Sequence, residues 1–76
     1  MCATVLDARG LTCPLPILRA SKVLKGLPDQ ALLSVLATDP SSARDFRSFC
    51  QQTGHQLVEW SEDADGVFHY LIRKIG

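Results

Sequence analysis

The sequence predicts an α+β two-layer sandwich: a mixed four-stranded sheet with two helices packed on one face, in the order β-α-β-α-β-β. Two segments carry apolar residues at helical spacing, four short segments are typical of strands, and turn residues separate them. The first strand–helix–strand unit favours parallel pairing, and the last two strands form an antiparallel hairpin. We expect one domain spanning residues 1–76, because a chain of 76 residues supports one hydrophobic core.

The N-terminal half is predicted to contain a strand, a helix and a second strand. The first strand runs from Thr4 to Asp7, and a turn at 8–10 follows it. The helix runs from Pro14 to Leu27, where Gly26 and the following proline end it. The second strand, 32–37, is an apolar run (LLSVLA) bounded by turn residues, which is typical of a mostly buried strand. The apolar face of the helix consists of Ile17, Ala20, Val23, Leu24 and Leu27.

The C-terminal half is predicted to contain a second helix and a hairpin. The sequence Asp-Pro-Ser-Ser at 39–42 is typical of a helix start, and the helix runs from Ser42 to Thr53 before Gly54. A strand from His55 to Ser61 follows, with Val58 and Trp60 on one side. The turn at 63–66 and the strand from Val67 to Lys74 complete the hairpin. The expected apolar positions are Ala43, Phe46, Phe49 and Cys50 in the helix, and Phe68, Tyr70 and Ile72 in the last strand.

The composition excludes several classes of function. Eight basic residues balance eight acidic ones, so no strongly positive field exists to hold a phosphate backbone, and we expect no direct nucleic-acid partner. No apolar run approaches the roughly 20 residues that span a bilayer, and the N-terminal residues do not resemble a signal peptide. We therefore expect a cytoplasmic protein with no membrane partner. Three widely spaced cysteines indicate reduced thiols rather than a disulfide scaffold.

Cys13 is the candidate reactive group, because it directly precedes a Pro-Leu-Pro at the start of a helix. We expect Cys13 at the N-cap, with Pro14 and Pro16 stiffening the first turn. The backbone N–H of Leu15 would then be the main donor to the sulfur. That donor and the helix dipole would both favour the thiolate, so the sequence predicts a moderately lowered pKa for Cys13.

The remaining thiols and imidazoles indicate less chemistry. Cys50 belongs to an apolar helix face and is interpreted as core, and Cys2 is assigned no role. The absence of a C-x-x-C pair argues against a dithiol cycle. The residues Cys13, Cys50, His55 and His69 are dispersed, so we expect no metal site, and a Cys–His hydrolase pair stays open as an alternative.

A rigid, accessible thiol without room for a large pocket suits a carrier, which takes a group from one protein and presents it to another. The surroundings of such a thiol serve as a docking surface. Leu15, Leu18 and Lys22 lie opposite the apolar face of the first helix, and two exposed leucines beside a thiol indicate a partner interface.

The spacing Asp7-x-x-Gly10-x-x-Cys13-Pro14-x-Pro16 resembles the motif of the TusA/SirA-like sulfur-carrier family. The resemblance covers nearly the whole chain and also rests on 38–40, 44–45, 49–50, 54–55 and 71–74. It implies the same two-layer fold and a sulfurtransferase-type carrier acting with partner enzymes.

By this resemblance, Cys13 accepts a sulfane sulfur as a persulfide from a cysteine desulfurase or a rhodanese and passes it to a downstream relay protein. No cofactor is implied beyond that transient sulfur. In the best-known branch the sulfur reaches the 2-thiouridine of tRNA, and other branches serve molybdenum-cofactor synthesis or sulfur oxidation.

The resemblance also implies that Asp39 and Asp45 help partner binding. Asp39 equally suits a turn before Pro40, and Asp45 suits the first turn of a helix, so both interpretations stay open. Some relatives carry an acidic pair before the proline, whereas Thr38 precedes Asp39 here, which bears on the choice of partner.

Two interpretations from other classes compete with the carrier. The resemblance implies a fold similar to the C-terminal domain of a bacterial initiation factor, which suggests an RNA-binding or translation-associated module. The zero net charge disfavours this interpretation. Cys13 also suits a redox sensor oxidised to sulfenic acid, although the sequence offers no evident resolving cysteine.

Overall fold

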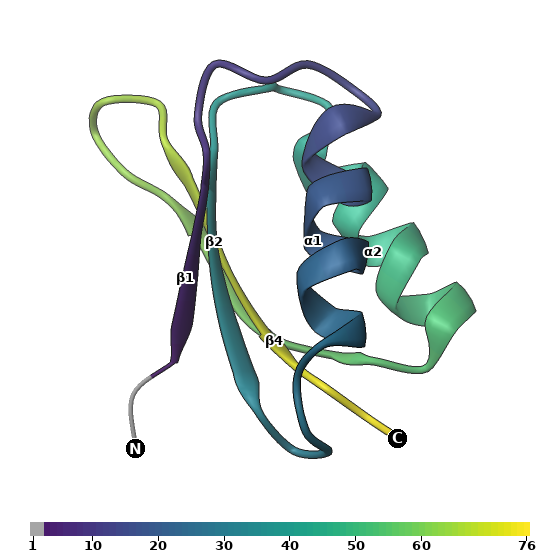
Figure 1. Cartoon of the computed structure of the whole chain (residues 1–76). Coiled ribbons are helices and arrows are strands. Elements are labelled where there is room, and N and C mark those ends of the chain that lie inside the picture. The colour runs from purple at the N-terminus through teal and green to yellow at the C-terminus, as the bar shows by residue number, and fades with distance from the viewer. Residues whose placement is uncertain (1–2) are drawn as a thin grey trace.

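Four strands form one sheet, and both helices lie on the same face of it (Figure 1). The computed structural model describes residues 3–76, so Cys2 lies outside the described residues. The elements are β1 (Thr4–Ala8), α1 (Leu15–Lys25), β2 (Leu32–Ala37), α2 (Ser42–Thr53), β3 (Gln56–Glu62) and β4 (Phe68–Arg73). The predicted fold class and element order are confirmed.

The sheet is mixed and has the order β1-β2-β4-β3. The strands β1 and β2 pair in parallel, with Leu6 opposite Val35. The other pairs, β2 with β4 and β3 with β4, are antiparallel. The last strand along the sequence therefore lies inside the sheet, between β2 and β3.

The core lies between the sheet and the two helices. Alternate residues of β2 are fully buried (Leu33, Val35 and Ala37), because helices cover one face of the sheet only. Cys50 belongs to this core, as predicted, and its burial raises the pKa of its thiol to about 11. The buried apolar residues are Ala8, Ala20, Leu24, Leu33, Val35, Ala37, Phe46, Cys50, Tyr70 and Ile72.

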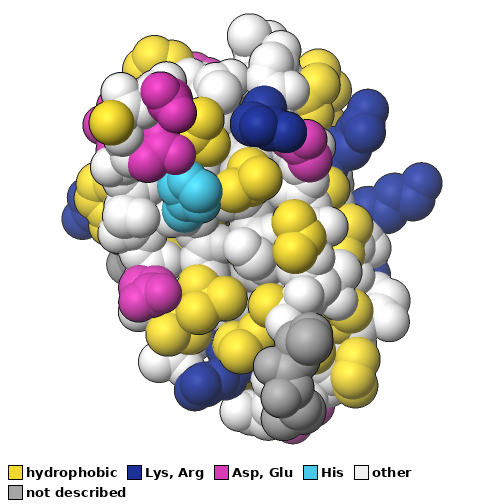
Figure 2. All heavy atoms as spheres, turned by 90° about the vertical axis from the view of Figure 1, so that its left-hand side faces the viewer, with side chains coloured by type: hydrophobic (Ala, Val, Ile, Leu, Met, Phe, Trp, Pro, Cys, Tyr) yellow, Lys and Arg dark blue, Asp and Glu magenta, His cyan; other side chains and the backbone are white. Residues whose placement is uncertain are grey.

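The opposite face of the sheet is uncovered (Figure 2). Apolar side chains are spread over much of it, with acidic groups gathered toward one upper corner. Val5 at the edge strand β1 is among its most exposed apolar side chains. The prediction that β2 is mostly buried therefore holds for one of its two faces.

The helix α1 is shorter than predicted at both ends, since it begins at Leu15 and ends at Lys25. Gly26 follows as the C-cap, and its N–H donates to the carbonyl of Val23 at 3.0 Å. The ammonium of Lys74 then donates to the carbonyls of Leu24 (2.7 Å) and Leu27 (2.9 Å). Lys74, the residue after β4, thus adds donors to carbonyls at and just beyond the last turn of α1, where intrahelical partners run out.

The helix α2 has the predicted bounds, and Gly54 closes it in the left-handed conformation with its N–H on the carbonyl of Cys50. The prediction that Val58 and Trp60 share a side assumes a regular strand, but the β3–β4 register shifts between Leu57 and Glu59. Trp60 pairs with Tyr70 beyond this shift, and their rings stack with centroids 6.4 Å apart. The inserted residue is a β-bulge, which breaks the alternation of side chains along a strand.

Candidate functional site

Two loops meet at one edge of the sheet, because the parallel strands β1 and β2 end there. The loop 9–14 leads from β1 to α1, and the loop 38–41 leads from β2 to α2, side by side in Figure 1. Two hydrogen bonds tie them. The N–H of Gly10 donates to Thr38 Oγ1 at 2.9 Å, and the N–H of Cys13 donates to Asp39 Oδ2 at 2.7 Å. These two hydrogen bonds therefore fix the backbone of the loop that carries Cys13.

The first of these loops begins with a clamp between Asp7 and Arg9. The Asp7 carboxylate accepts from the Arg9 backbone N–H (3.1 Å), from Nε (2.9 Å) and from Nη2 (2.8 Å). These hydrogen bonds, and the guanidinium charge, lower the pKa of Asp7 to about 2. Asp7 thus shapes the turn that leads to Cys13 and lies outside the immediate surroundings of the thiol.

Gly10 is required for its backbone conformation, since its φ is +79°. Gly10→Ala is expected to lower the free energy of unfolding by about 1–2 kcal/mol, because L-residues other than Asn and Asp rarely adopt this region. A Cβ at this position would meet open space, so the loss would be conformational and not steric. Urea denaturation measures the difference. Gly10→Asn is the matched control and should lose clearly less stability; equal losses for both variants would contradict the conformational account.

The predicted capping of α1 by Cys13 is wrong. The N-cap is Pro14, which makes no side-chain cap, and the Cys13–Pro14 peptide is cis. The N–H of Leu15 donates to the carbonyl of Thr12 at 2.9 Å instead of to the sulfur. A carbonyl oxygen is a better acceptor than a thiol sulfur, so the N–H of Leu15 donates to the Thr12 carbonyl and not to the Cys13 sulfur. Cys13 consequently lies one residue before the helix cap.

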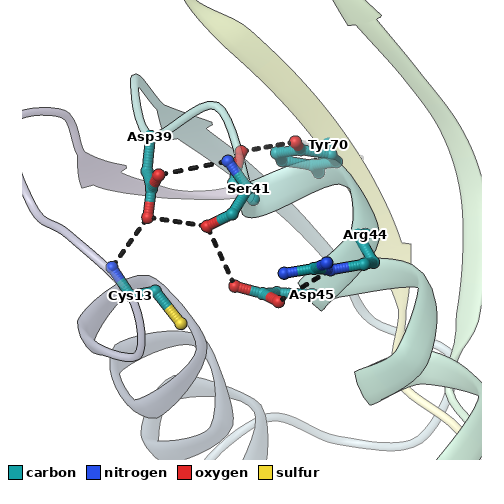
Figure 3. Close-up of polar contacts among 7 residues, drawn as sticks. Cys13, Asp39, Ser41, Arg44, Asp45 and Tyr70 are labelled. Atoms are coloured by element: carbon teal, nitrogen blue, oxygen red, sulfur yellow. Dashed lines mark hydrogen bonds and ion pairs between the residues drawn. The ribbon is translucent and has the colours of Figure 1, made fainter.

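The thiol of Cys13 is exposed and points toward the carboxylate of Asp45, at the start of α2 (Figure 3). The neighbouring carboxylate of Asp45 raises the pKa of Cys13 above its ordinary value. Partial desolvation and the charges of Asp45 and Asp39 act in the same direction, while Arg44 opposes them. The predicted lowering of this pKa is therefore wrong in sign, because the carboxylates of Asp45 and Asp39 lie near the sulfur.

Asp39, Ser41 and Asp45 form a connected polar group, here called the carboxylate arc, around Cys13 (Figure 3). Asp39 Oδ1 accepts the Ser41 N–H at 3.1 Å, and Oδ2 accepts the Ser41 hydroxyl at 3.0 Å. The same hydroxyl lies 3.4 Å from Asp45 Oδ2. The N–H groups of Ser41 and Cys13 lower the pKa of Asp39, so its carboxylate stays ionised beside the thiol.

The other predicted site residues divide into two groups. Pro16 is buried within the first turn of α1. Leu15 and Leu18 are 43% and 57% exposed, and Lys22 is also exposed on the same helix, so the structure presents the three together as expected. Their role in binding a partner stays a prediction.

Sequence reasoning missed the roles of Thr38 and Ser41. Ser41 was expected only to cap α2, but its hydroxyl joins the two carboxylates and makes no cap. The signal available was the run Thr-Asp-Pro-Ser immediately after a buried strand, because hydroxyl and carboxyl side chains there hydrogen-bond to nearby backbone. The pairing of this run with the Cys13 loop depends on the tertiary fold.

Within residues 3–76, Cys13 is exposed at the surface of the molecule. Hollows of about 530 and 690 Å³ are lined by the β3–β4 hairpin and by the segment after α1, and Cys13 lines neither. Within residues 3–76, no three His, Cys, Asp or Glu side chains are grouped so that they could hold a metal ion. In the same range, no helix combines the length and apolar character needed to cross a bilayer.

The fold and the site define a small α+β domain whose described part presents the exposed Cys13 on a loop edge, next to two carboxylates and a helix with exposed leucines. Residues 4–74 match the family model described as sulfurtransferase TusA. The chain belongs to the TusA family, and its role is that of a sulfur carrier.

Individual relatives agree with this family. The chain is 54% identical over 69 residues to a sulfur carrier protein TusA of Allochromatium vinosum, covering 91% of this chain and 90% of the relative. It is 49% identical over 73 residues to a putative sulfur carrier protein of Neisseria meningitidis serogroup A, covering 96% and 97%. The crystal structure of a SirA-like protein from Desulfitobacterium hafniense superposes with a TM-score of 0.84 at 28% identity, covering 96% of this chain and 99% of that one.

Proposed function

We propose that Cys13 accepts a sulfane sulfur as a persulfide from a cysteine desulfurase or a rhodanese and relays it to an acceptor protein. The observation that carries this proposal is the exposed, unpaired thiol of Cys13 on a loop whose backbone N–H is held by Asp39 at 2.7 Å. A free thiol on a fixed and open edge can meet a cysteine that belongs to another protein. Family membership supports the same chemistry.

The transfer is an exchange between two cysteines. The Cys13 sulfur attacks the outer sulfur of the donor's persulfide, and a new S–S bond forms while the donor's S–S bond breaks. The electron pair of the broken bond stays on the donor's cysteine sulfur, which takes up the proton that Cys13 loses. One sulfane sulfur is transferred from the donor's cysteine to Cys13, and no external oxidant is consumed. Delivery to the acceptor repeats the exchange, with Cys13 as the leaving thiolate.

The test is incubation with a cysteine desulfurase and free cysteine, followed by intact-mass measurement. The expected result is a gain of one sulfur atom that is reversed by a thiol reductant and is absent from Cys13→Ser. Cleavage at Arg9 and Arg19 gives a peptide in which Cys13 is the only cysteine, so the adduct can be located without altering the other thiols. An adduct that persists in Cys13→Ser would refute the assignment.

For the fate of the sulfur, we propose delivery to a relay protein that leads to 2-thiouridine in tRNA. Removal of the gene should then lower the 2-thiouridine content of tRNA, and Cys13→Ser should fail to restore it. Normal thiolation together with loss of molybdoenzyme activity or of sulfur oxidation would assign one of the alternative branches. The carrier itself contacts proteins only in this scheme, in keeping with its zero net charge.

The redox-sensor alternative has less support than the carrier. Sensor cysteines are typically accessible thiols with a low pKa, whereas the carboxylates beside Cys13 raise its pKa. The other described cysteine, Cys50, is buried in the core and is not placed to resolve a sulfenic acid. Peroxide reactivity well above that of free cysteine, without sulfur transfer, would reverse this ranking.

A further inference from the structure

We propose that His55 forms a pH-sensitive clip for the C-terminal residues, closed while its imidazole is neutral and opened when the ring takes up a proton. The clip consists of the His55 ring and the backbone N–H of Ile75, which donates to Nδ1 at 3.0 Å. Figure 1 shows the C-terminal end of the chain leaving the sheet near the segment that enters β3. The inference is independent of sulfur transfer at Cys13.

The clip uses a side chain where the antiparallel pairing of β3 and β4 stops. Gln56 and Arg73 are the last residues paired across these two strands at this end of the sheet. Beyond them, the N–H of Ile75 donates to the ring of His55 and not to a backbone carbonyl. A carbonyl accepts a hydrogen bond throughout the neutral pH range, whereas an imidazole nitrogen accepts one only while it is unprotonated. The hold on Ile75 therefore depends on pH.

The hydrogen bond fixes the protonation state of the ring. Because Nδ1 accepts the N–H of Ile75, its lone pair is free, and the single proton of the neutral imidazole is on Nε2. A protonated ring carries an N–H on both nitrogens, so Nδ1 would meet the Ile75 N–H as a second donor. Protonation thus removes the bond and sets two donors against each other, which opens the clip.

The surroundings of His55 favour the neutral ring. His55 is half-buried two residues after α2, and its ring centroid lies 6.1 Å from that of the uncharged Phe49 in this helix. From the end of β4, the charge of Lys74 acts on the ring, while Arg73 directs its Nη1 to Gln56 Oε1. Desolvation, followed by the charge of Lys74, lowers the pKa of His55 below its ordinary value of 6.5.

The sign of the pH dependence follows from this direction. A histidine whose pKa is lower in the folded chain stabilises the fold above the unfolded pKa of 6.5. That contribution is lost as the pH falls through the lower pKa of the folded protein. The clip is therefore closed at neutral pH and opens in acid.

The neighbouring bonds of the C-terminal segment do not change in the same pH range. The N–H of Gly76 donates to Asp29 Oδ1 at 2.9 Å, and this bond lowers the pKa of Asp29 below its ordinary 3.8. The N–H of Lys74 donates to the carbonyl of Ala31 at 2.8 Å, which carries no titratable group. Among these acceptors, the His55 ring alone changes its charge between about pH 5 and pH 8. Opening is therefore expected at the clip and not along the whole segment.

The test is an NMR titration of the isotope-labelled chain between about pH 5 and pH 8. At the upper end, the nitrogen shifts of His55 should show the proton on Nε2. On acidification, the amide resonance of Ile75 should move with the same midpoint as the His55 ring, below 6.5. The exchange protection of the Ile75 N–H, corrected for its intrinsic rate, should fall by about 2- to 10-fold, which is the loss of one hydrogen bond. The Lys74 N–H should show no comparable fall.

Three variants separate the acceptor from other effects of pH. His55→Asn keeps an acceptor oxygen near the position of Nδ1 but takes up no proton, so Ile75 should stay protected over the whole range. His55→Leu removes the acceptor, so the protection of Ile75 should be low at every pH. His69→Asn removes the chain's other imidazole, in β4, and should leave the native profile unchanged.

Two results would overturn the inference. One is an Ile75 amide that does not follow the titration of the His55 ring. The other is a pH-dependent protection of Ile75 that persists in His55→Asn. Neither result would bear on the proposed function, because these measurements involve no transfer of sulfur.

Discussion

Phe46→Ala is expected to lower the free energy of unfolding by about 3–5 kcal/mol, because it leaves a cavity at the centre of the core. Phe46 is fully buried, stacks on Tyr70 with ring centroids 4.6 Å apart, and meets Phe49 edge-on at 6.5 Å. A domain of this size has a total stability of about 4–11 kcal/mol. The substitution therefore removes a large share of it and loosens the attachment of α2 to the sheet.

Urea denaturation followed by circular dichroism measures this loss. Phe49→Ala removes the same atoms from a half-buried position on the same helix and should lose clearly less stability. Val5→Ala, on the exposed face of β1, should change the free energy of unfolding by less than about 0.5 kcal/mol. If Phe46→Ala lowered the free energy of unfolding no more than Phe49→Ala does, the core would not be centred on Phe46.

Tyr70→Phe is expected to lower the free energy of unfolding by about 1–3 kcal/mol, although it removes a single oxygen. The Tyr70 hydroxyl lies 2.6 Å from Ser42 Oγ in a buried contact, and Ser42 is 2% exposed. Without the phenol, the serine hydroxyl would be left in the core with no partner in the structure. This bond also ties the first residue of α2 to β4, close to the carboxylate arc.

The double variant Ser42→Ala/Tyr70→Phe tests the cause. Replacing both partners removes the unsatisfied hydroxyl, so the double variant should be more stable than Tyr70→Phe alone. Chemical denaturation of the four proteins of this cycle gives the coupling energy between the two groups. Strictly additive losses would show that the hydroxyl pair contributes nothing beyond its separate parts.

The elements with strong local patterns were predictable from the sequence. The helix α2 has the predicted bounds because a Ser pair opens it, an apolar stripe follows, and Gly54 must adopt a positive φ to end it. The strand β2 was equally clear as an apolar run between turns. The helix α1 was predicted too long, since an apolar Leu27 continues the helical spacing although it lies beyond Gly26 and packs as a loop residue.

The position of the exposed thiol of Cys13 could be predicted from the sequence, but the direction of its pKa shift could not. Its position before a helix and its exposure follow from the local sequence. The carboxylates that set its pKa come from the loop after β2 and from α2, and only the parallel pairing of β1 and β2 brings them to the thiol. The bulge at 57–59 was similarly hidden, because it depends on the register against β4. Features that depend on contacts between distant segments cannot be predicted from a local sequence pattern.

The internal position of β4 has a consequence for how the protein is made. A nascent chain that has emerged only as far as α2 holds β1 and β2, but the edge of β2 that β4 will occupy is bare, and β3 also lacks its only partner until β4 follows. Sheet closure therefore depends on pairings between segments far apart in sequence, such as Leu33 with Ile72, and such non-local pairings form slowly. The Lys74 contacts at the end of α1 likewise join segments about 50 residues apart, so they need the C-terminal part of the chain. The start of α2, which lies beside Cys13, is likewise complete only once β4 is in place, because the Tyr70 hydroxyl lies 2.6 Å from Ser42 Oγ.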